Sequence, residues 1–515
     1  MTEAGKRSQN SRNGRSVPRC ARPLPLLIAD AGVETRGAPP GVEVSSVEYD
    51  SRRIRPGALF VAVRGFTVDG HDFVRDAAAR GAVAALVERP TGVEGLREVE
   101  VSDTRRAMGP IAHEFYGRPS EKLATHGVTG TNGKTTTTYF IDSIMREAGM
   151  TTGVVGTLGY RIGDRIEKGE RTSPESLDLA RLLATMADEG VESVAMEVSS
   201  HALALSRATG VRFDTATFTN LSRDHLDFHG TFAEYKRVKK SLFESVEKEA
   251  GKPGCSAVVN AADDFGRELI AHLRSSAAIE VLTYGAADGD VRAEDVESTS
   301  SGTRAVFKTP VGSVPVRLRL VSAFNVMNAL AAMTVAVSRS LPLETAAEGL
   351  AGLATVPGRL ELVDSGQPFA VVVDYAHTPD ALEKVLLAIR GLRPERVITV
   401  FGCGGDRDRG KRPIMGEIAV TNSDVVIVTS DNPRTEEPLS IIEEIVEGPG
   451  RDTEKALVEV IEDRREAIGR AISVAAPGDV VLIAGKGHEN YQIVGTETRH
   501  FDDREEAIEA IRTLS

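Results

Sequence analysis

A lysine followed by four threonines, at the end of a glycine-rich stretch, is the feature of this sequence that most clearly points to chemistry. Residues 127–138 read GVTGTNGKTTTT. Glycines in such a loop let backbone N–H groups surround a phosphate, Lys134 can reach its outer oxygens, and the Thr135 hydroxyl can bind magnesium. The usual spacing places a first glycine where this chain has Val128. We nevertheless predict a nucleotide phosphate site, because a plain glycine turn explains neither the lysine nor the threonines.

The flanks of this loop have the pattern that a phosphate site requires. The apolar run 123–128 predicts a buried strand, and the helical spacing of apolar residues after the loop predicts a helix whose N-terminus favours an anion. These apolar residues are Tyr139, Ile141, Ile144 and Met145. A strand, a glycine loop and a helix in this order support the prediction.

Polar residues also end three further apolar runs in the same part of the chain, SVAMEVSS, TATFTNL and SAVVN. Because the carboxyl ends of parallel strands meet at one edge of a sheet, the side chains that follow them gather there. Those side chains are Glu197, Ser199, Ser200, His201, Asp224, His225, Asn260 and Asp263. Any one alone is better explained as a loop cap or a solvated carboxylate, but three such strands beside a phosphate loop indicate an active site.

A metal site is predicted within this group. Glu197 and His225 are expected to share a metal near the phosphates with Thr135, since carboxylate, imidazole and hydroxyl groups suit magnesium or manganese. Magnesium prefers oxygen, so the histidine indicates either a second, looser metal or a contact through water.

Three successive α/β blocks are needed to carry these residues. Residues 1–24 are basic and polar and are predicted to be a disordered tail. Residues 25–120 are predicted to form a small α/β domain, with strands LFVAVRG and AVAALVE around a helix closed by Gly81. Residues 121–354 are predicted to form a central P-loop domain with a mainly parallel sheet. Residues 355–515 are predicted to form a Rossmann-like α/β domain, joined through the turn TVPGR.

The third block repeats the pattern of strands that run into glycine-rich or charged loops. Its strands are predicted within 370–377, 396–408, 424–434 and 479–489. The loop GCGGDRD lacks the helix-opening spacing of a dinucleotide-binding loop, so a nicotinamide site is a weak alternative. The sequence VSSH lacks the glycine frame of a nucleophile elbow.

The bulk composition excludes several classes of protein. A length of 515 residues requires more than one core, and 41% apolar with 27% charged residues is ordinary for a globular protein. A net charge of −13 argues against a general nucleic-acid binder. No apolar run reaches the roughly eighteen residues of a membrane span. The scattered Cys20, Cys255 and Cys403 fit neither a disulfide framework nor a zinc site, so we expect a cytoplasmic protein.

At this point the order of motifs resembles the Mur ligase family. The motifs are VTGTNGKTT, AMEVSSHAL, FTNLSRDHLDFHG, FNVMNALAA, VPGRLE, VVDYAHTPDAL, GCGGDRDRGKRP, DNPRTEEP and AGKGHENYQ. They extend from about Ser45 to the C-terminus and leave only the tail uncovered.

The resemblance implies an ATP- and Mg²⁺-dependent amide ligase of peptidoglycan synthesis. ATP is expected to phosphorylate the D-Glu side chain of UDP-MurNAc-L-Ala-D-Glu, and the amine of meso-diaminopimelate to attack the acyl phosphate. A carboxylate is inert to amines until its oxygen becomes a good leaving group, and both steps concentrate negative charge that Lys134 and metal ions stabilise. The expected enzyme is a monomer that binds no nucleic acid and inserts into no membrane.

The resemblance also assigns roles to single residues. ATP binding falls on Gly130, Thr131, Asn132, Gly133, Lys134, Thr135, Thr136, Asn328 and Arg359, while Asn325, Asp374 and His377 match further characteristic positions. Metal binding falls on Thr135, Glu197, His225 and Lys239, and the last of these matches the family's carbamylated lysine. Composition alone favours a solvated basic helix around Lys239, since three other basic residues crowd beside it in YKRVKKSLF.

Substrate contacts are implied in all three blocks. The uridine nucleotide is expected at Ser51 and at the turn of residues 66–68, and the muramoyl dipeptide at Thr172, Ser173, Ser199 and Arg207. Ser173 stands where a second threonine is common, and Leu205 where some members have glutamine, so we carry over no contact for Leu205. The amino-acid substrate is expected at Arg407, Asp431, Asn432, Pro433, Arg434, Gly485 and Glu489.

Arg434 favours meso-diaminopimelate over L-lysine. It can hold the extra carboxylate through two parallel hydrogen bonds, whereas the side-chain ammonium of lysine would meet a like charge. An arginine paired to Glu436 or Glu437 in an exposed turn is the structural alternative.

Other functions stay open but less favoured. One alternative is the same ligase using L-lysine, and another is a folylpolyglutamate-synthetase-like ligase, which would need a pteridine pocket in place of the YDSRR block. A plain P-loop ATPase or kinase would not need the DNPR and GKGHE loops. A non-catalytic relative would be expected to lose Lys134, Glu197 or His225.

Overall fold

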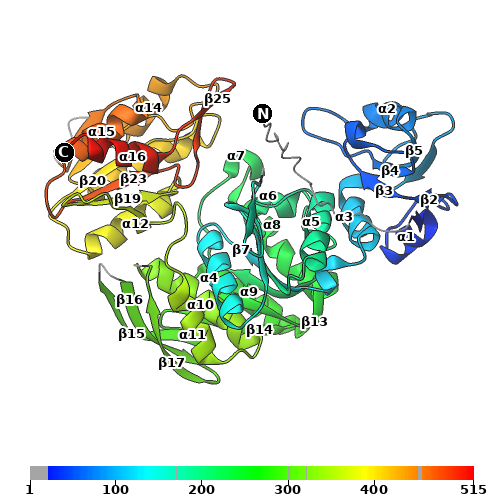
Figure 1. Cartoon of the computed structure of the whole chain (residues 1–515), viewed down its shortest axis with the longest axis horizontal. Coiled ribbons are helices and arrows are strands. Elements are labelled where there is room, and N and C mark those ends of the chain that lie inside the picture. Colours follow the sequence, from blue (N-terminus) through cyan, green and yellow to red (C-terminus); the bar gives the residue numbers. More distant parts are fainter. Residues whose placement is uncertain (1–20, 170, 300–301, 321, 450–454, 515) are drawn as a thin grey trace, which may run out of the picture.

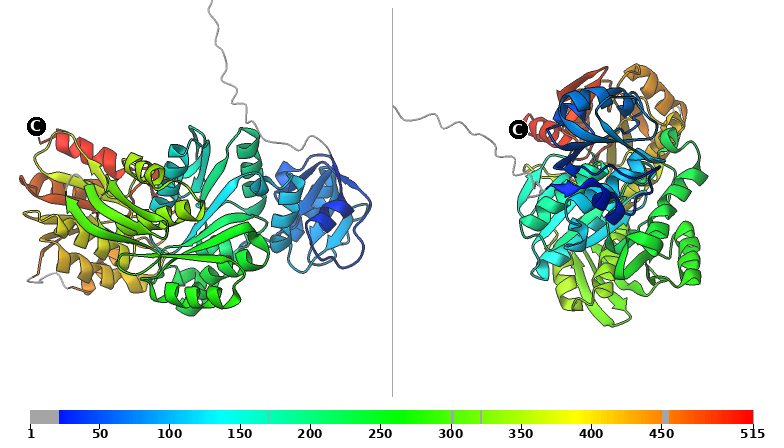
Figure 2. Two further views of the ribbon diagram at one scale, coloured as in Figure 1. Left: turned by 90° about the horizontal axis from the view of Figure 1, so that it is seen from below. Right: turned by 90° about the vertical axis from the view of Figure 1, so that its right-hand side faces the viewer.

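Three α/β domains follow one another along the chain. The computed structural model describes residues 21–169, 171–299, 302–320, 322–449 and 455–514. The N-terminal domain lies on one side of the central domain and the C-terminal domain on the other (Figure 1). A view at right angles shows the molecule as elongated, with these two domains at opposite ends (Figure 2).

A four-stranded parallel sheet is the core of the N-terminal domain. Its order is β3 (Ser46–Glu48), β4 (Ala58–Val61), β5 (Ala82–Val87) and β6 (Arg97–Glu100). The helices are α1 (Leu24–Asp30), α2 (Val74–Ala79) and α3 (Thr104–Phe115). Gly81 follows α2 with φ +101°, a conformation that suits glycine at the end of a helix.

The predicted disordered tail of residues 1–24 is wrong at its C-terminal end. Arg22–Pro23 form β1, which pairs with β2 (Glu43–Val44). Leu24 begins α1, and the side chains of Leu24 and Leu27 are fully buried in the cluster that includes α3. This short apolar helix therefore has a core to join, which the sequence pattern did not reveal. Residues 1–20 lie outside the described residues.

An eleven-stranded sheet runs through the central domain. In order, its strands are β10 (Arg165–Glu167), β9 (Gly159–Ile162), β8 (Thr152–Gly156), β11 (Ser193–Glu197), β7 (Ala124–Thr129), β12 (Phe213–Phe218), β13 (Gly251–Asn260), β14 (Glu280–Gly285), β15 (Val291–Thr299), β16 (Gly302–Thr309) and β17 (Gly312–Leu318). In this spatial order, the neighbouring strands from β8 through β11, β7, β12, β13 and β14 to β15 are parallel. Antiparallel strands extend the sheet at both edges.

Helices cover both faces of this sheet, as its continuously apolar parallel strands require. One face packs against α4 (Lys134–Glu147), α10 (Ala323–Ser338) and α11 (Leu343–Gly352). The other packs against α5 (Ser176–Asp188), α8 (Phe232–Ser245) and α9 (Asp264–Ser276). The short helices α6 (Ser200–Ala204) and α7 (Leu226–His229) follow β11 and β12. The carboxyl ends of β8, β11, β7 and β12 thus lie side by side.

The C-terminal domain contains a six-stranded sheet. Its order is β18 (Glu361–Val363), β19 (Ala370–Asp374), β23 (Val480–Ala484), β20 (Val397–Phe401), β21 (Val425–Val428) and β22 (Leu457–Val460), with only β18 antiparallel. The helices are α12 (Pro379–Gly391), α13 (Arg412–Asn422), α14 (Pro438–Glu447), α15 (Arg464–Val474) and α16 (Asp503–Arg512). A hairpin of β24 (Tyr491–Val494) and β25 (Glu497–His500) follows β23.

Local sequence explains where α12 begins. The Thr378 side chain accepts a hydrogen bond from the Ala381 N–H, and Pro379 occupies the first helical position, where its missing N–H costs nothing. This is the helix that the sequence predicts near Pro379. Among the described residues, no helix is both long and apolar enough to cross a membrane.

Candidate active site

The phosphate loop connects β7 to α4 as the sequence predicts. Gly130 and Gly133 adopt φ values of +148° and +84°, which glycine adopts most readily. A Cβ atom would collide with the Thr219 hydroxyl at Gly130 and with the Asn328 amide at Gly133. Both glycines are therefore required by space as well as by conformation.

Lys134 ties the two ends of this loop together. Its Nζ donates to the carbonyl oxygens of Gly130 (3.0 Å) and Thr131 (2.8 Å). Burial lowers the pKa of Lys134, although the nearby Glu197 carboxylate opposes this shift. An entering phosphate would offer the ammonium group a charged partner in place of the two carbonyls.

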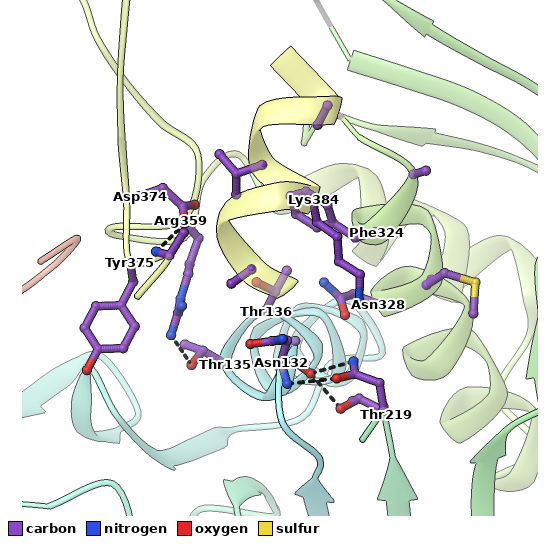
Figure 3. Close-up of a pocket in the computed structure, with 18 of the residues that line it drawn as sticks. Asn132, Thr135, Thr136, Thr219, Phe324, Asn328, Arg359, Asp374, Tyr375 and Lys384 are labelled. Carbon is purple, nitrogen blue, oxygen red and sulfur yellow. Dashed lines mark hydrogen bonds between the residues drawn. The ribbon is translucent and has the colours of Figure 1, made fainter. Parts of the chain in front are cut away.

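Thr135 and Glu197 meet beside the loop. The Thr135 hydroxyl donates to Glu197 Oε1 at 3.0 Å. Arg359 Nη2 from the C-terminal domain donates to the same hydroxyl at 3.2 Å (Figure 3). Glu197 is only 1% exposed and also accepts from the backbone N–H and the hydroxyl of Thr157, at 2.8 and 3.1 Å. Two oxygen ligands of the type that magnesium prefers thus converge next to the phosphate site.

A cavity of about 330 Å³ lies beside the Thr135–Glu197 pair, and His225 is on its wall. His225 contacts a carboxylate other than that of Glu197. Its Nε2 is 3.2 Å from Asp224 Oδ2, and its ring centroid is 4.8 Å from that of His201. Burial lowers the pKa of His225 to about 3. Its imidazole is therefore neutral at neutral pH, which is the form that binds metal.

The four predicted metal ligands do not form one closed cluster. Within the described ranges, no three His, Cys, Asp or Glu side chains gather closely enough to hold a metal ion. Thr135 and Glu197 are in contact, whereas His225 and Lys239 line the cavity with other partners. These residues would supply only part of the coordination shell of a metal ion, and oxygens of the nucleotide and of water would supply the rest. The shared metal stays a prediction.

Lys239 is separated from the other basic residues of α8. It is 1% exposed, and its Nζ donates to the Gly130 carbonyl at 2.7 Å and lies 4.5 Å from the Tyr235 ring centroid. Burial, and then the charge of Lys134, lower its pKa well below the ordinary value. By contrast, Lys236 and Lys240 form ion pairs with glutamates at the surface of the domain.

A second cavity, of about 560 Å³, opens between the central and C-terminal domains (Figure 3). The predicted nucleotide residues Asn132, Thr136, Asn328 and Arg359 line it. Asn328 Nδ2 donates to Asn325 Oδ1 at 3.2 Å on α10. The apolar side chains of the cavity suit a planar base. Sequence reasoning missed these lining residues, which are Phe324, Met327, Val385 and Leu387.

A carboxylate of α12 ties the C-terminal domain to the phosphate loop. Asn132 Nδ2 donates to Asp380 Oδ2 at 2.6 Å, and Lys384 lies 2.9 Å from the other oxygen of Asp380. Asp374 and His377 lie just before the same helix. Asp374 accepts the backbone N–H groups of Leu360 and Ala376, so it shapes the loop that carries Arg359.

The predicted dipeptide residues surround the Thr135–Glu197 pair. Thr172, Ser173, Ser199 and Arg207 all line the 330 Å³ cavity. The Ser173 hydroxyl donates to the Glu197 carbonyl at 2.9 Å, and the Thr172 hydroxyl lies 3.1 Å from that of Thr157. Sequence reasoning missed Thr157, which follows the end of β8 by one residue; the rule of polar residues after parallel strands could have found it.

Arg207 is held by a carboxylate that two further arginines share. Arg207 Nε donates to Glu175 Oε1 at 3.1 Å, and Arg105 and Arg171 each donate to the same carboxylate at 2.7 Å. Ser51 lies apart from this cavity, buried in the N-terminal domain. In the predicted uridine turn, the Phe66 ring meets that of Phe228 in α7 at a centroid distance of 6.1 Å.

The predicted amino-acid site assembles in the C-terminal domain. Arg434 donates through Nη1 to the carbonyls of Gly405 (2.7 Å) and Asn432 (3.5 Å), and its backbone φ is +52°. Glu436 pairs with Arg412 instead, at 2.8 Å. Within the described residues Arg434 forms no salt bridge, so its guanidinium is not committed to a neighbouring glutamate.

The remaining residues of this site lie in the surrounding loops. Asp431 and Asn432 are buried after β21, and Pro433 leads directly into Arg434. Gly485 and Glu489 come from the loop after β23, and the Tyr375 hydroxyl, which borders both cavities, lies 3.4 Å from Glu489 Oε1. Arg407 is exposed on the loop after β20.

Comparison with known proteins agrees with this architecture. The Mur ligase family, catalytic domain, matches residues 43–116; the Mur ligase middle domain matches 128–336; and the Mur ligase, glutamate ligase domain, matches 358–487. These matches cover more than half of the sequence. The chain belongs to the Mur ligase family.

Relatives that match most of the chain share one name. A UDP-N-acetylmuramoyl-L-alanyl-D-glutamate–2,6-diaminopimelate ligase of Geobacillus kaustophilus is 48% identical over 471 residues, covering 91% of this chain and 95% of the relative. Its namesake from Geobacter metallireducens is 47% identical, covering 92% and 95%. A solved structure with the same name is 33% identical, with a TM-score of 0.66 over 92% of this chain and 95% of that one.

A more distant likeness extends to another member of the fold. A folylpolyglutamate synthase of Mycobacterium tuberculosis complexed with ADP and AMPPCP has a TM-score of 0.62 at 18% identity, over 80% of this chain and 94% of that one. At this identity the likeness concerns the fold alone.

Proposed function

We propose that this chain is an ATP-dependent ligase that joins meso-diaminopimelate to UDP-MurNAc-L-Ala-D-Glu. The observation that carries the proposal is the meeting of Lys134, Thr135 and Glu197 with Ser173 and Arg207 around one cavity. A phosphate site and a site for an anionic peptide thus share a wall. The relatives above, matched over nine-tenths of the chain, support the same activity.

The chemistry follows from this juxtaposition. The D-Glu carboxylate oxygen attacks the γ-phosphorus of ATP, the bond to the bridging oxygen breaks, and ADP leaves. The substrate amine then attacks the acyl carbon, phosphate leaves with the former carboxylate oxygen, and the amine loses a proton. Lys134 is placed to stabilise the charge of the transferring group, and Arg207 to hold the acidic dipeptide.

Magnesium fits the donors that this chain presents. Thr135 and Glu197 would hold the ion, and it would neutralise phosphate charge during transfer. Lys239, once carbamylated by carbon dioxide, would add an anionic oxygen ligand near His225, consistent with the burial of its amine, which lowers its pKa. The metal and the carbamate belong to the proposal.

Location and assembly are also proposed. We expect a monomer in the cytoplasm, where ATP is available. The two cysteines among the described residues, Cys255 and Cys403, are free and buried, which is compatible with a reducing compartment.

An isotope experiment tests the acyl-phosphate route. UDP-MurNAc-L-Ala-D-Glu labelled with ¹⁸O in the D-Glu side-chain carboxylate is incubated with ATP and meso-diaminopimelate. The proposal expects one ¹⁸O atom in each released phosphate and a product with the mass of the tripeptide nucleotide. Phosphate released without the label would overturn the route, and absence of the tripeptide product would overturn the function.

A further inference from the structure

A buried lysine that the mechanism above leaves unused lies at the centre of the amino-acid loops. Lys486 follows Gly485 after β23, and its side chain has no exposed surface. Its Nζ donates to Asn432 Oδ1 at 3.1 Å and lies 3.5 Å from Asp431 Oδ1 and 3.7 Å from Glu489 Oε2. An ammonium ion is retained in such a place only when carboxylates and hydrogen bonds compensate its lost hydration.

Lys486 fixes the orientation of the Asn432 amide. Asn432 Oδ1 accepts from Lys486 and from the Ile493 backbone N–H at 3.0 Å, while its Nδ2 donates to Glu489 Oε2 at 2.9 Å. The lysine therefore connects three loops: the one after β21, the one after β23 and the start of the β24–β25 hairpin.

Asp431 and Glu489 each use one carboxylate oxygen in this network around Lys486. Asp431 Oδ1 and Glu489 Oε2 face Lys486, which leaves Asp431 Oδ2 and Glu489 Oε1. A Cβ atom at residue 485 would lie 2.8 Å from Asp431 Oδ2, so any side chain in place of Gly485 would crowd that oxygen. Glu489 Oε1 lies 3.4 Å from the Tyr375 hydroxyl, and the Tyr491 hydroxyl also hydrogen-bonds to the Glu489 carboxylate.

We propose that Lys486 is a positioning residue that holds Asp431 and Glu489 so that their other oxygens bind the distal ammonium group of the amino-acid substrate. The inference rests on the proposed function and deepens it. Arg434 and Arg407 would account for the distal carboxylate of meso-diaminopimelate, and the two carboxylates anchored by Lys486 for its distal ammonium. The site then recognises both charged groups at the distal end of the substrate.

The electrostatics of the pair agree with this geometry. Burial raises the pKa of Asp431, but the charge of Lys486, followed by that of Arg464, holds it below its usual value. Burial, and then the charge of Asp431, raise the pKa of Glu489, and Lys486 limits the rise. The titratable and charged groups that face Glu489 are Asp431, Lys486, Arg434, Tyr375, Tyr491 and Arg464. Without Lys486, Glu489 would accept a proton at higher pH and lose its attraction for an ammonium ion.

The test compares two amine substrates on matched variants. Lys486→Met removes the charge, Lys486→Gln keeps a donor to Asn432, and Lys486→Arg keeps the charge. Lys455→Met makes the same change at an exposed lysine of the same domain that pairs with Glu417. Each variant is assayed with meso-diaminopimelate and with 2-aminopimelate, which keeps the distal carboxylate and lacks the distal ammonium.

We expect Lys486→Met to raise KM for meso-diaminopimelate roughly thirtyfold, the scale for truncating one partner of a buried charge pair. KM for ATP, KM for the UDP-dipeptide and the constants for 2-aminopimelate should change little. The rise in KM for meso-diaminopimelate should grow as pH falls, because Glu489 then becomes neutral. Lys486→Arg should restore much of the discrimination between the two amines, and Lys455→Met should match the unmodified enzyme.

Equal losses with both amines would show a merely structural role and overturn the inference, as would an unchanged KM for meso-diaminopimelate. If Lys486→Met does not fold, the comparison of Lys486→Gln with Lys486→Arg decides: equal discrimination by these two variants refutes the role of the charge. If the unmodified enzyme ligates neither amine, the proposed function itself fails, which distinguishes the two failures.

Discussion

Single residues of the phosphate loop are predictable from sequence because their roles depend on local geometry. Gly130, Gly133, Lys134 and Thr135 follow from one motif, and the structure places them around one loop. Thr157 and Lys486 do not follow from any local pattern. Their roles arise from strands and loops that meet only in the folded chain, at Glu197 and at Asp431 respectively.

Replacing Lys134 tests the phosphate site. We expect Lys134→Ala to lower kcat by at least about a hundredfold, the scale for losing one donor to a charged transition state. Stability should fall little, since among the described residues Nζ donates only to backbone carbonyls of its own loop. Steady-state ligation and thermal unfolding measure the two effects, with the exposed Lys122→Ala as control. Near-normal ligation in Lys134→Ala would refute the assignment.

Lys239 should react with carbon dioxide where its neighbours on α8 do not. The neutral amine forms the new N–C bond, and the lowered pKa of Lys239 gives it a larger neutral fraction than an exposed lysine at the same pH. Carbamylation should therefore persist at neutral pH and decline as pH falls. ¹³C NMR in labelled bicarbonate should show a carbamate signal that Lys239→Ala abolishes and Lys240→Ala retains.

The same variant has an expected kinetic phenotype. Lys239→Ala should be nearly inactive and partly rescued by formate or acetate, which can supply the missing oxygen ligand. Full activity without added carboxylate, or an unmodified amine in the active enzyme, would contradict the carbamate.

At the scale of elements, sequence periodicity located the strands that lead into functional loops. The runs before residues 130, 198, 375 and 430 are short, continuous and apolar, as buried parallel strands are, and correspond to β7, β11, β19 and β21. Sequence periodicity did not locate α1 or the β24–β25 hairpin. α1 has only seven residues, and both hairpin strands are exposed or half-buried, so neither has a periodic signal.

The loop between β21 and α14 should set the choice of amino acid. In the described part of the chain, the Arg434 guanidinium donates only to carbonyl oxygens, and Glu436 is paired with Arg412, so Arg434 is available to a carboxylate. We expect Arg434→Ala to lower kcat/KM for meso-diaminopimelate about 10- to 100-fold, the value of hydrogen bonds to a charged group. Its kcat/KM for L-lysine should not fall.

The control for this prediction is Arg409→Ala, which removes an exposed arginine that pairs with Glu444 on α14. It should preserve the preference. Retention of the full preference in Arg434→Ala would contradict the role of the loop.

At the scale of the whole molecule, the relative placement of the domains is what the sequence could not supply. The division at residues 120 and 354 stays a prediction, although each of the three intervals contains one of the main sheets. Polar contacts between the central and C-terminal domains include Arg359 with Thr135, Asp380 with Asn132, and Arg223 with Asp408 at 3.4 Å. The N-terminal domain instead packs apolar residues of α3 against Leu177 and Ala180 of α5. The polar contacts leave no hydrophobic pattern in the sequence.

This placement has a functional consequence. The amino-acid loops do not line the cavity of Lys134 and Glu197, although Tyr375 borders both that cavity and Glu489. An amine bound at Arg434 must still reach the acyl phosphate, so the C-terminal domain has to bring its substrate to the central domain. Ligation thus requires all three domains to hold their substrates together.

The most direct measurement is phosphate release by the full chain with ATP, UDP-MurNAc-L-Ala-D-Glu and a panel of amino acids. We predict release that depends on all three substrates, with kcat/KM for meso-diaminopimelate far above that for L-lysine. Comparable efficiency with both amino acids would contradict the assigned selectivity while leaving a ligase. Phosphate release that does not require the UDP-dipeptide would contradict the ligase itself.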